Sequence, residues 1–183
     1  MAGLARVFIA TSLDGFIAGP GDDLSWLPAP GSIPEGGDFG YSAFMAQVGA
    51  LLMGRTTYDV VSGFGGEWPY GDKPVLVATH RPLTPRVPTV RAVQGTPVEL
   101  LALARAAAGP AHDVYVDGGA TIRALFEADL IDHAIVTVVP VVLGAGSPLF
   151  AGLSARRTLT LERAEALPGG LVQLSYRPVR TAG

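Results

Sequence analysis

Runs of apolar residues along this chain alternate with segments of mixed apolar and polar residues, and the alternation predicts strands and helices in turn. Short apolar runs rich in valine, isoleucine and leucine are typical of strands buried in a sheet. We expect such strands over residues 4–11, 50–53, 74–78, 89–93, 113–116 and 134–142. Two later segments, residues 158–166 and 171–177, flank Pro168-Gly169-Gly170 and predict a terminal hairpin.

Four segments between these strands have the pattern of helices. We expect helices over residues 39–48, from residue 56 onward, and over residues 96–107 and 120–128. Asp38 stands where the N-cap of the first helix is expected, since short polar side chains accept hydrogen bonds from the first-turn N–H groups. Thr96 and Glu99 have the spacing of a capping box at the start of the third helix.

Strands that alternate with helices predict an α/β fold with three layers, in which a mostly parallel central sheet carries helices on both faces. The C-terminal hairpin would add antiparallel strands at one edge. A chain of 183 residues is long enough for one such domain, so we expect a single domain over residues 1–183. The long loop expected over residues 12–37 is rich in Gly, Pro and Asp, and such loops are usually functional or mobile.

Composition excludes several classes of function. The net charge is −3 with no cluster of Lys and Arg, which argues against a nucleic-acid partner. Without cysteine the chain has no disulfide, thiol nucleophile or thiolate metal site, and no His, Asp and Glu cluster has metal-ligand spacing. No signal peptide or apolar run of transmembrane length is evident. We therefore expect a cytoplasmic protein with no membrane partner and no metal.

Two separate segments share one plan, an apolar strand that ends in glycine and opens a helix. They are Leu-Leu-Met-Gly-Arg-Thr-Thr-Tyr over residues 51–58 and Val-Tyr-Val-Asp-Gly-Gly-Ala-Thr-Ile over residues 114–122. Glycine lets a ligand approach the backbone, and the first-turn N–H groups favour an anion such as phosphate. Two such elements predict a dinucleotide site that includes Gly54, Arg55, Thr56, Gly118, Gly119, Ala120 and Thr121.

Each of these residues also has a purely structural interpretation. A glycine pair alone indicates no more than a tight strand-to-helix turn. Arg55 on its own is typical of a solvated side chain, and Thr56 of a helix cap. The phosphate interpretation rests on the two segments occurring together, each at the end of an apolar strand.

Four motifs in this order resemble the dihydrofolate reductase superfamily, in particular its bacterial branch related to the reductase domain of riboflavin biosynthesis. They are Ser-Leu-Asp-Gly-Phe-Ile-Ala at residues 12–18, Gly-Arg-Thr-Thr-Tyr at 54–58, the glycine pair at 118–119, and Pro-Val-Val-Leu-Gly-Ala-Gly-Ser-Pro-Leu-Phe at 140–150. The resemblance runs from about Arg6 to Phe150. It implies an oxidoreductase that uses NADPH to reduce a small heterocyclic substrate, pterin-like or ribosylaminopyrimidine-like.

The resemblance also implies roles for individual residues in cofactor binding. Ile17 and Ala18 would lie against the nicotinamide, while Arg55 and Thr56 would contact the adenosine half. Thr79 and Arg81 follow the next strand, where the family places groups near the adenine ribose. Two arginines favour NADPH over NADH because guanidinium groups bind a 2′-phosphate well.

Hydride transfer to a C=N or C=O bond also needs a proton donor. In dihydrofolate reductases an acid lies on the helix before the Gly-Arg-x-Thr segment, and Asp38 occupies a comparable place as the candidate catalytic acid. A simple N-cap is the alternative role of Asp38. Residues 27–37 are rich in proline and glycine, whereas the family's folate pocket has an acid and aromatic residues there, which argues against folate itself.

Two further hypotheses follow from the resemblance. One is a nucleotide-binding module of the same fold without efficient turnover, which NADPH oxidation against a panel of heterocycles would distinguish from a reductase. The other is a mainly structural homo-oligomer, and because related reductases are commonly dimers, a homodimer is expected whichever function holds.

Overall fold

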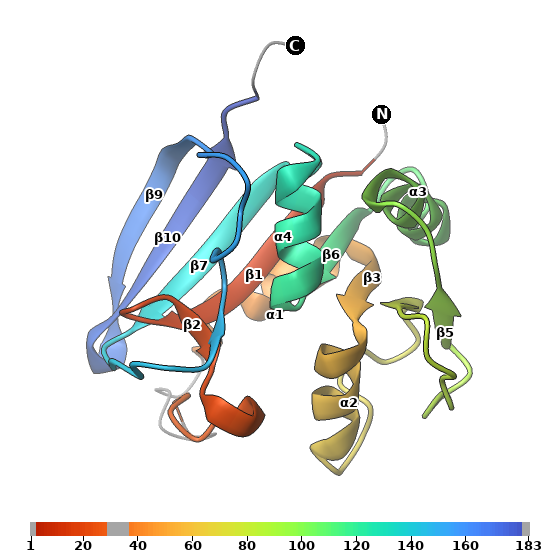
Figure 1. Cartoon of the computed structure of the whole chain (residues 1–183), viewed down its shortest axis with the longest axis horizontal. Helices are drawn as coiled ribbons and strands as arrows, with labels where there is room; N and C mark the ends of the chain where they lie inside the picture. The colour runs from red at the N-terminus through yellow and green to blue at the C-terminus, as the bar shows by residue number, and fades with distance from the viewer. Residues whose placement is uncertain (1–2, 29–36, 181–183) are drawn as a thin grey trace.

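A central sheet of eight strands organises the chain, whose computed structural model describes residues 3–28 and 37–180 (Figure 1). The strands lie in the order β5-β4-β3-β6-β1-β7-β10-β9. Their bounds are Ala5–Ser12 (β1), Val48–Gly54 (β3), Val75–Ala78 (β4), Val90–Val93 (β5), Asp113–Asp117 (β6), His133–Val139 (β7), Leu159–Leu167 (β9) and Leu171–Pro178 (β10).

The sheet is mostly parallel, as the sequence predicts. The pairs from β5 through β4, β3, β6 and β1 to β7 are all parallel, whereas β10 runs antiparallel to both β7 and β9. The predicted terminal hairpin is confirmed: β9 and β10 are joined by the 3-10 turn Pro168–Gly170 and pair from Leu171 with Leu167 onward. It extends one edge of the sheet without a crossover helix.

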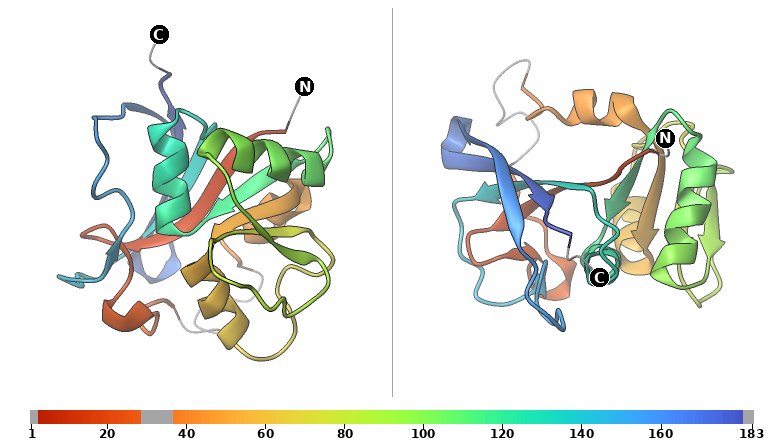
Figure 2. Two further views of the ribbon diagram at one scale, coloured as in Figure 1. Left: turned by 45° about the vertical axis from the view of Figure 1, so that its right-hand side comes forward. Right: turned by 90° about the horizontal axis from the view of Figure 1, so that it is seen from above.

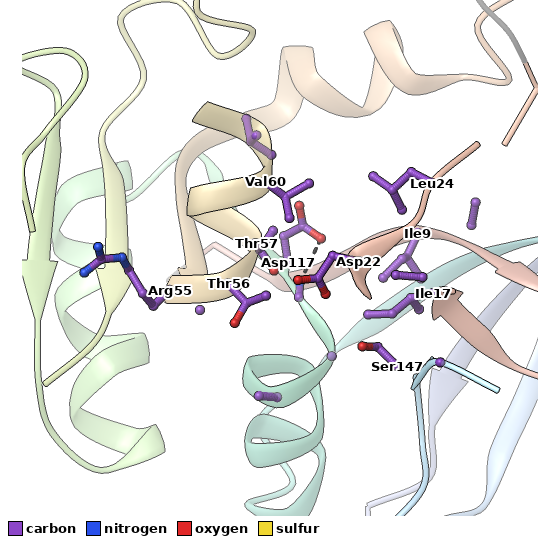
Figure 3. Close-up of a pocket in the computed structure, with 18 of the residues that line it drawn as sticks. Ile9, Ile17, Asp22, Leu24, Arg55, Thr56, Thr57, Val60, Asp117 and Ser147 are labelled. Atoms are coloured by element: carbon purple, nitrogen blue, oxygen red, sulfur yellow. Dashed lines mark hydrogen bonds between the residues drawn. The ribbon is translucent and has the colours of Figure 1, made fainter. Parts of the chain in front are cut away.

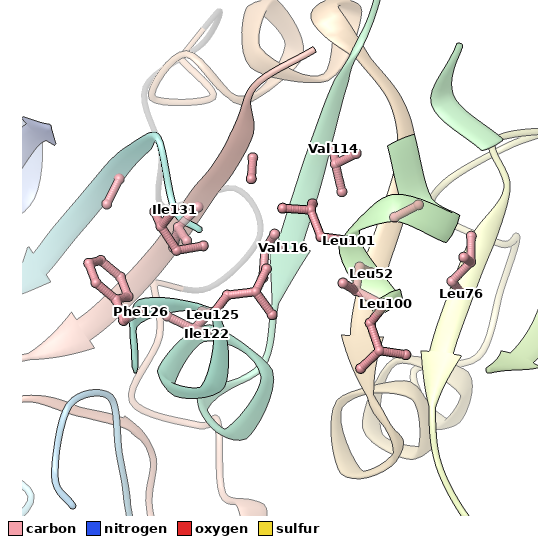
Figure 4. Packing of buried hydrophobic residues seen from close by; sticks show 14 of the residues in the cluster. Leu52, Leu76, Leu100, Leu101, Val114, Val116, Ile122, Leu125, Phe126 and Ile131 are labelled. Carbon is pink, nitrogen blue, oxygen red and sulfur yellow. The ribbon is translucent and has the colours of Figure 1, made fainter. Parts of the chain in front are cut away.

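Helices cover both faces of this sheet, so the predicted three layers are confirmed. The helices are Tyr41–Gln47 (α1), Arg55–Gly63 (α2), Pro97–Ala108 (α3) and Gly119–Glu127 (α4). Side chains of α3 and α4 pack in one apolar cluster, which includes Leu101 and Ile122 (Figure 4). Those of α1 and α2 belong to a second cluster with Phe44 and Tyr58. The view from above shows α1 and α3 on opposite sides of the sheet (Figure 2).

Strand β3 shows why its sequence is a continuous apolar run rather than an alternating one. Successive side chains of a strand point to opposite faces. Leu52 therefore enters the α3–α4 cluster, while Leu51 and Met53 enter the α1–α2 cluster, and all three are fully buried. A strand in the centre of a sheet covered on both faces needs apolar residues at every position.

The expected loop over residues 12–37 is only partly a loop, and the first helix is shorter than expected. Strand β2 (Phe16–Ala18) pairs with β8 (Ser147–Pro148), and a 3-10 turn covers Pro20–Asp22. These two strands are far apart in the sequence and too short to give a periodic pattern. Helix α1 begins at Tyr41 with Gly40 as its N-cap, so Asp38 lies two residues before the cap rather than at it.

The two strand-to-helix turns that share the glycine plan pack directly against each other. A Cβ at Gly118 would collide with the Thr57 side chain, and one at Gly54 would lie 3.1 Å from Thr121 Oγ1. Gly118 also has a φ of +84°, in the left-handed region that disfavours other residues. Glycine is therefore needed here for the approach of β3–α2 to β6–α4, whatever ligand binds.

We predict that Gly118→Ala lowers the free energy of unfolding by at least about 2 kcal/mol, because the new methyl group meets Thr57 in a strained backbone conformation. Denaturant unfolding measures this loss. Gly63→Ala is the matched control: it lies in α2 with open space at its Cβ position, and alanine there should be neutral or stabilising by up to about 1 kcal/mol. Equal effects of the two changes would contradict the packing argument.

Candidate functional site

A cleft of about 610 Å³ opens at the edge of the sheet where β3 and β6 end (Figure 3). Its walls come from the first turns of α2 and α4, the middle of β1, strand β2, the Pro20–Asp22 turn and strand β8. In α/β sheets ligands bind beyond the carboxyl ends of the strands. The cleft is lined by most of the residues that the sequence predicts for cofactor binding, namely Ile17, Ala18, Gly54, Arg55, Thr56, Gly118, Gly119 and Ala120.

Three other predicted cofactor residues lie outside the lining of this cleft. Thr121 is buried beneath it, with its side chain towards Gly54. Thr79 and Arg81 follow β4, and the Thr79 hydroxyl accepts a hydrogen bond of 3.1 Å from the Arg81 N–H. This turn lies beside the Arg55 end of the cleft, since Arg55 donates to the Pro82 carbonyl at 2.7 Å.

The two helices that begin at the cleft lack the capping groups that helix α3 has. Helices α2 and α4 have glycine N-caps, no side chain that caps the first turn and no acidic residue there. In α3, by contrast, Thr96 and Glu99 form the predicted capping box. The first-turn N–H groups of a helix have no partner within the helix. Two adjacent uncapped N-termini therefore suit a ligand with two phosphates.

Asp117 brings a carboxyl group into the same cleft from the end of β6. Its Oδ1 accepts a hydrogen bond of 2.7 Å from the Gly118 N–H. Burial raises the pKa of Asp117 to about 6 from an ordinary value of 3.8, although the Gly118 N–H and the Tyr115 hydroxyl act in the opposite direction. A carboxyl group with this pKa is protonated in a fraction of the molecules near neutral pH.

Three tyrosines share the surroundings of Asp117. Burial raises the pKa of Tyr41 to about 12 and that of Tyr70 and Tyr115 well above the usual range, and the charge on Asp117 adds to each shift. The Tyr115 hydroxyl donates to the Phe8 carbonyl at 2.9 Å. These phenols therefore stay neutral, and Asp117 is the group among them that titrates near neutral pH.

Asp117 lies within the predicted phosphate-binding segment of residues 114–122 but is not among the site residues that the sequence predicts. A polar residue at the end of an apolar strand, directly before a glycine turn, was the available signal. The expectation of an acid on the helix before Gly54 drew attention to Asp38 instead. Asp22, which also lines the cleft, has a φ of 61° that the sequence does not indicate.

Asp38 lies on an exposed segment and does not line the cleft. Its carboxylate accepts hydrogen bonds from the Gly40 N–H at 2.9 Å and the Ser42 N–H at 2.6 Å. The Ser42 hydroxyl and N–H hold the pKa of Asp38 below its usual range. This environment favours the ionised form and suits a residue that orders the start of α1. The role of Asp38 as catalytic acid stays a prediction without geometric support.

Strand β2 covers one end of the cleft, and the turn before β2 is hydrogen-bonded to the segment before β8. The Asp14 carboxylate accepts hydrogen bonds from the Ser12 hydroxyl at 2.6 Å, the Leu143 N–H at 3.1 Å and the Gly144 N–H at 2.7 Å. These bonds, led by that of Ser12, lower the pKa of Asp14 to about 2. A Cβ atom placed on Gly119 would lie 3.0 Å from Cδ1 of Ile17, so the Ile17 side chain packs closely against Gly119.

Two further findings concern metals and membranes. Over residues 3–28 and 37–180, no three His, Cys, Asp or Glu side chains are grouped to hold a metal ion. No helix in this part of the chain has the length and apolar character that a membrane span requires.

Solved structures with the same fold include a riboflavin biosynthesis protein and a deaminase/reductase, as these are named. A Shewanella sp. PV-4 protein provisionally assigned to riboflavin biosynthesis is 37% identical, with a TM-score of 0.85, over 98% of this chain and 100% of that one. A Thermotoga maritima diaminohydroxyphosphoribosylaminopyrimidine deaminase/5-amino-6-(5-phosphoribosylamino)uracil reductase shares the fold at a TM-score of 0.69 and 17% identity. The match covers 97% of this chain but 57% of the Thermotoga chain.

Relatives of similar length occur in Bacillus subtilis strain 168. The uncharacterised protein YwjB is 34% identical over 171 residues, which are 93% of this chain and 95% of YwjB. The uncharacterised protein YyaP is 26% identical over 178 residues. The RibD C-terminal domain family matches residues 5–173, from the first strand of the sheet into the last. The chain therefore belongs to the RibD C-terminal domain family.

Proposed function

We propose that this chain is an NADPH-dependent reductase that transfers a hydride to a small heterocyclic substrate, pterin-like or ribosylaminopyrimidine-like. The observation that carries the proposal is the cleft itself, which brings two helix N-termini without side-chain caps together with the half-buried Asp117 carboxyl group, whose pKa is raised to about 6. The name of the Thermotoga protein, which includes a 5-amino-6-(5-phosphoribosylamino)uracil reductase, supports the same reaction class. An anionic dinucleotide and a substrate that needs a proton both suit this combination.

The residues of the cleft fit NADPH in a definite order. The N–H groups at the starts of α2 and α4 would hold the diphosphate, and Arg55 with Arg81 would face the 2′-phosphate. Ile17 and Ala18 would exclude water from the nicotinamide, because strand β2 lies against Gly119 at the start of α4. When bound, NADPH supplies the hydride.

Asp117 takes the role of proton donor in this proposal. A carboxyl group with a pKa of about 6 can donate a proton to a ring nitrogen or carbonyl oxygen as the hydride arrives at the neighbouring carbon. Its hydrogen bond from the Gly118 N–H fixes its position at the end of β6. A homodimer is part of the proposal on the strength of the family resemblance.

Binding of NADPH should raise the melting temperature of the protein by several degrees at saturating concentration, and NADH should raise it less. Arg55→Ala should reduce the NADPH shift, because it removes a donor beside the uncapped start of α2. Thermal unfolding with increasing dinucleotide measures both effects. Arg163→Ala on β9 is the control and should leave the shift unchanged. Absence of any shift with millimolar dinucleotide would overturn the proposed function.

Asp117→Asn should slow NADPH oxidation about 10²–10⁴-fold, because it removes the proton donor and keeps its shape. In the unaltered protein kcat/KM should fall as pH rises through about 6, since the acid must be protonated to act. Asp117→Asn should lose this pH dependence. The assay follows NADPH oxidation with a dihydropterin and with a ribosylaminopyrimidine.

The control for this experiment is Asp38→Asn, which should keep both the rate and the pH profile. The opposite result, an inactive Asp38→Asn and an active Asp117→Asn, would restore the role that the sequence suggests for Asp38. Tight NADPH binding with no oxidation on any acceptor would favour a nucleotide-binding module.

Asp117 should also make stability depend on pH. Its folded-state pKa lies above the unfolded value of 3.8, so the folded protein holds the extra proton and stability is lost as pH rises from about 4 to about 6. Asp117→Asn should not show this loss, and relative to the unaltered protein it should gain about 2–3 kcal/mol between pH 4 and pH 7. Urea unfolding at both pH values measures the difference. If the stability difference between Asp117→Asn and the unaltered protein is the same at pH 4 and pH 7, Asp117 is solvated in the folded state.

A further inference from the structure

A carboxylate lies between the two arginines that the proposed function assigns to the cofactor's 2′-phosphate. Asp59 stands one turn after Arg55 on α2, and its Oδ1 is 2.7 Å from Arg55 Nε. The other carboxylate oxygen is 3.7 Å from Arg81 Nη2. Figure 3 shows the Arg55 guanidinium directed away from the Asp117 end of the cleft.

The arginines of this cluster are already engaged by protein acceptors. Arg55 donates to Asp59 through Nε and to the Pro82 carbonyl through Nη1 at 2.7 Å. The side chains of Asp59 and Arg81 are 45% and 64% exposed, so both can be reached by a ligand at the rim. With Asp59 ionised, the three side chains carry one net positive charge instead of two.

This charge balance affects a phosphate and a hydroxyl differently. A 2′-phosphate carries a charge near −2 and is repelled by a carboxylate within the same cluster. It must also compete with Asp59 for the arginine N–H groups. A ribose 2′-hydroxyl carries no charge and can donate a hydrogen bond to a carboxylate. Asp59 therefore weakens binding of the phosphorylated ribose and leaves the unphosphorylated one unaffected or favoured.

We propose that Asp59 is a specificity-determining residue that limits the preference of this site for NADPH over NADH. The inference rests on the proposed function, because it needs the adenosine half of a dinucleotide at Arg55. The arginines supply affinity for the 2′-phosphate, and Asp59 offsets part of it. The ratio of the two dissociation constants, rather than either one alone, is the quantity that Asp59 controls.

The experiment compares ligands that differ only at the 2′ position of the adenosine. Dissociation constants are measured by calorimetry for adenosine 2′,5′-bisphosphate and AMP, and then for NADPH and NADH. Asp59→Asn should bind each 2′-phosphorylated ligand about tenfold more tightly, with no gain for AMP or NADH. The gain should shrink at high salt, since the cluster is exposed.

Two control variants separate this effect from a general change of charge or helix structure. Asp59→Glu keeps the charge and should keep the ratio near that of the unaltered protein. Glu165→Gln removes an exposed carboxylate that pairs with Arg163 on β9 at 2.7 Å, far from α2 in the chain. Glu165→Gln should leave the affinities for all four ligands unchanged.

The outcomes distinguish this inference from the proposed function. Binding of all four ligands with an unchanged ratio in Asp59→Asn would overturn the role of Asp59 and leave the reductase proposal intact. Weaker binding of the 2′-phosphorylated ligands in Asp59→Asn would also overturn it, because Asp59 would then serve to orient the arginines. Failure of every ligand to bind the unaltered protein would overturn both proposals together.

Discussion

The approach of two strand-to-helix turns, β3–α2 and β6–α4, is the packing constraint on which the site depends. Strands β3 and β6 are neighbours in a parallel sheet, so the helices that follow them begin side by side. Gly118 leaves space for Thr57, and Gly54 for Thr121. A larger residue at Gly118 would separate the turns and the helix N-termini that form the floor of the cleft.

The same constraint explains why two neighbouring helices begin without a side-chain cap. Helix α3 begins away from the cleft and has a complete capping box. Helices α2 and α4 begin at the cleft with glycine, which offers no side chain to their first-turn N–H groups. First-turn N–H donors without a side-chain cap are available to an anion. Helices α2 and α4 therefore lack the stabilisation of a side-chain cap at the place where a bound anion can take its role.

The charged groups of the candidate site lie in two different environments. Asp117 lies among tyrosines and apolar side chains, where burial opposes ionisation. Beside the Arg55 end of the cleft, Asp59 and Arg81 are exposed and Arg55 is partly buried, and solvent screens the mutual attraction of these three side chains. A proton-holding group and a phosphate-binding group need these opposite environments, since a low dielectric raises a carboxyl pKa and water stabilises clustered charges. The site offers both environments because Asp117 lines the cleft at the end of β6, whereas Asp59 and Arg81 lie beside its Arg55 end, outside the lining.

The order and type of most elements could be predicted from the sequence because they depend on local patterns. Continuous apolar runs indicated the central strands, Thr96 and Glu99 indicated the start of α3, and Pro168–Gly170 indicated the hairpin. The pairing of β2 with β8 could not be predicted, because it joins short segments that are remote in the chain.

The sequence by itself determined the α/β fold and the two glycine turns, since both depend on patterns of residues that are close together in the chain. Only the tertiary structure decided which carboxyl group faces the cleft. Asp38 and Asp117 are chemically identical in the sequence, but Asp38 is exposed and hydrogen-bonded to Ser42, whereas Asp117 is half-buried in the cleft at the end of β6. Tertiary packing likewise placed Asp59 between Arg55 and Arg81, because Arg81 reaches α2 from a different strand. The pKa and the charge balance of a site depend on groups brought together from distant parts of the chain, and no local pattern contains them.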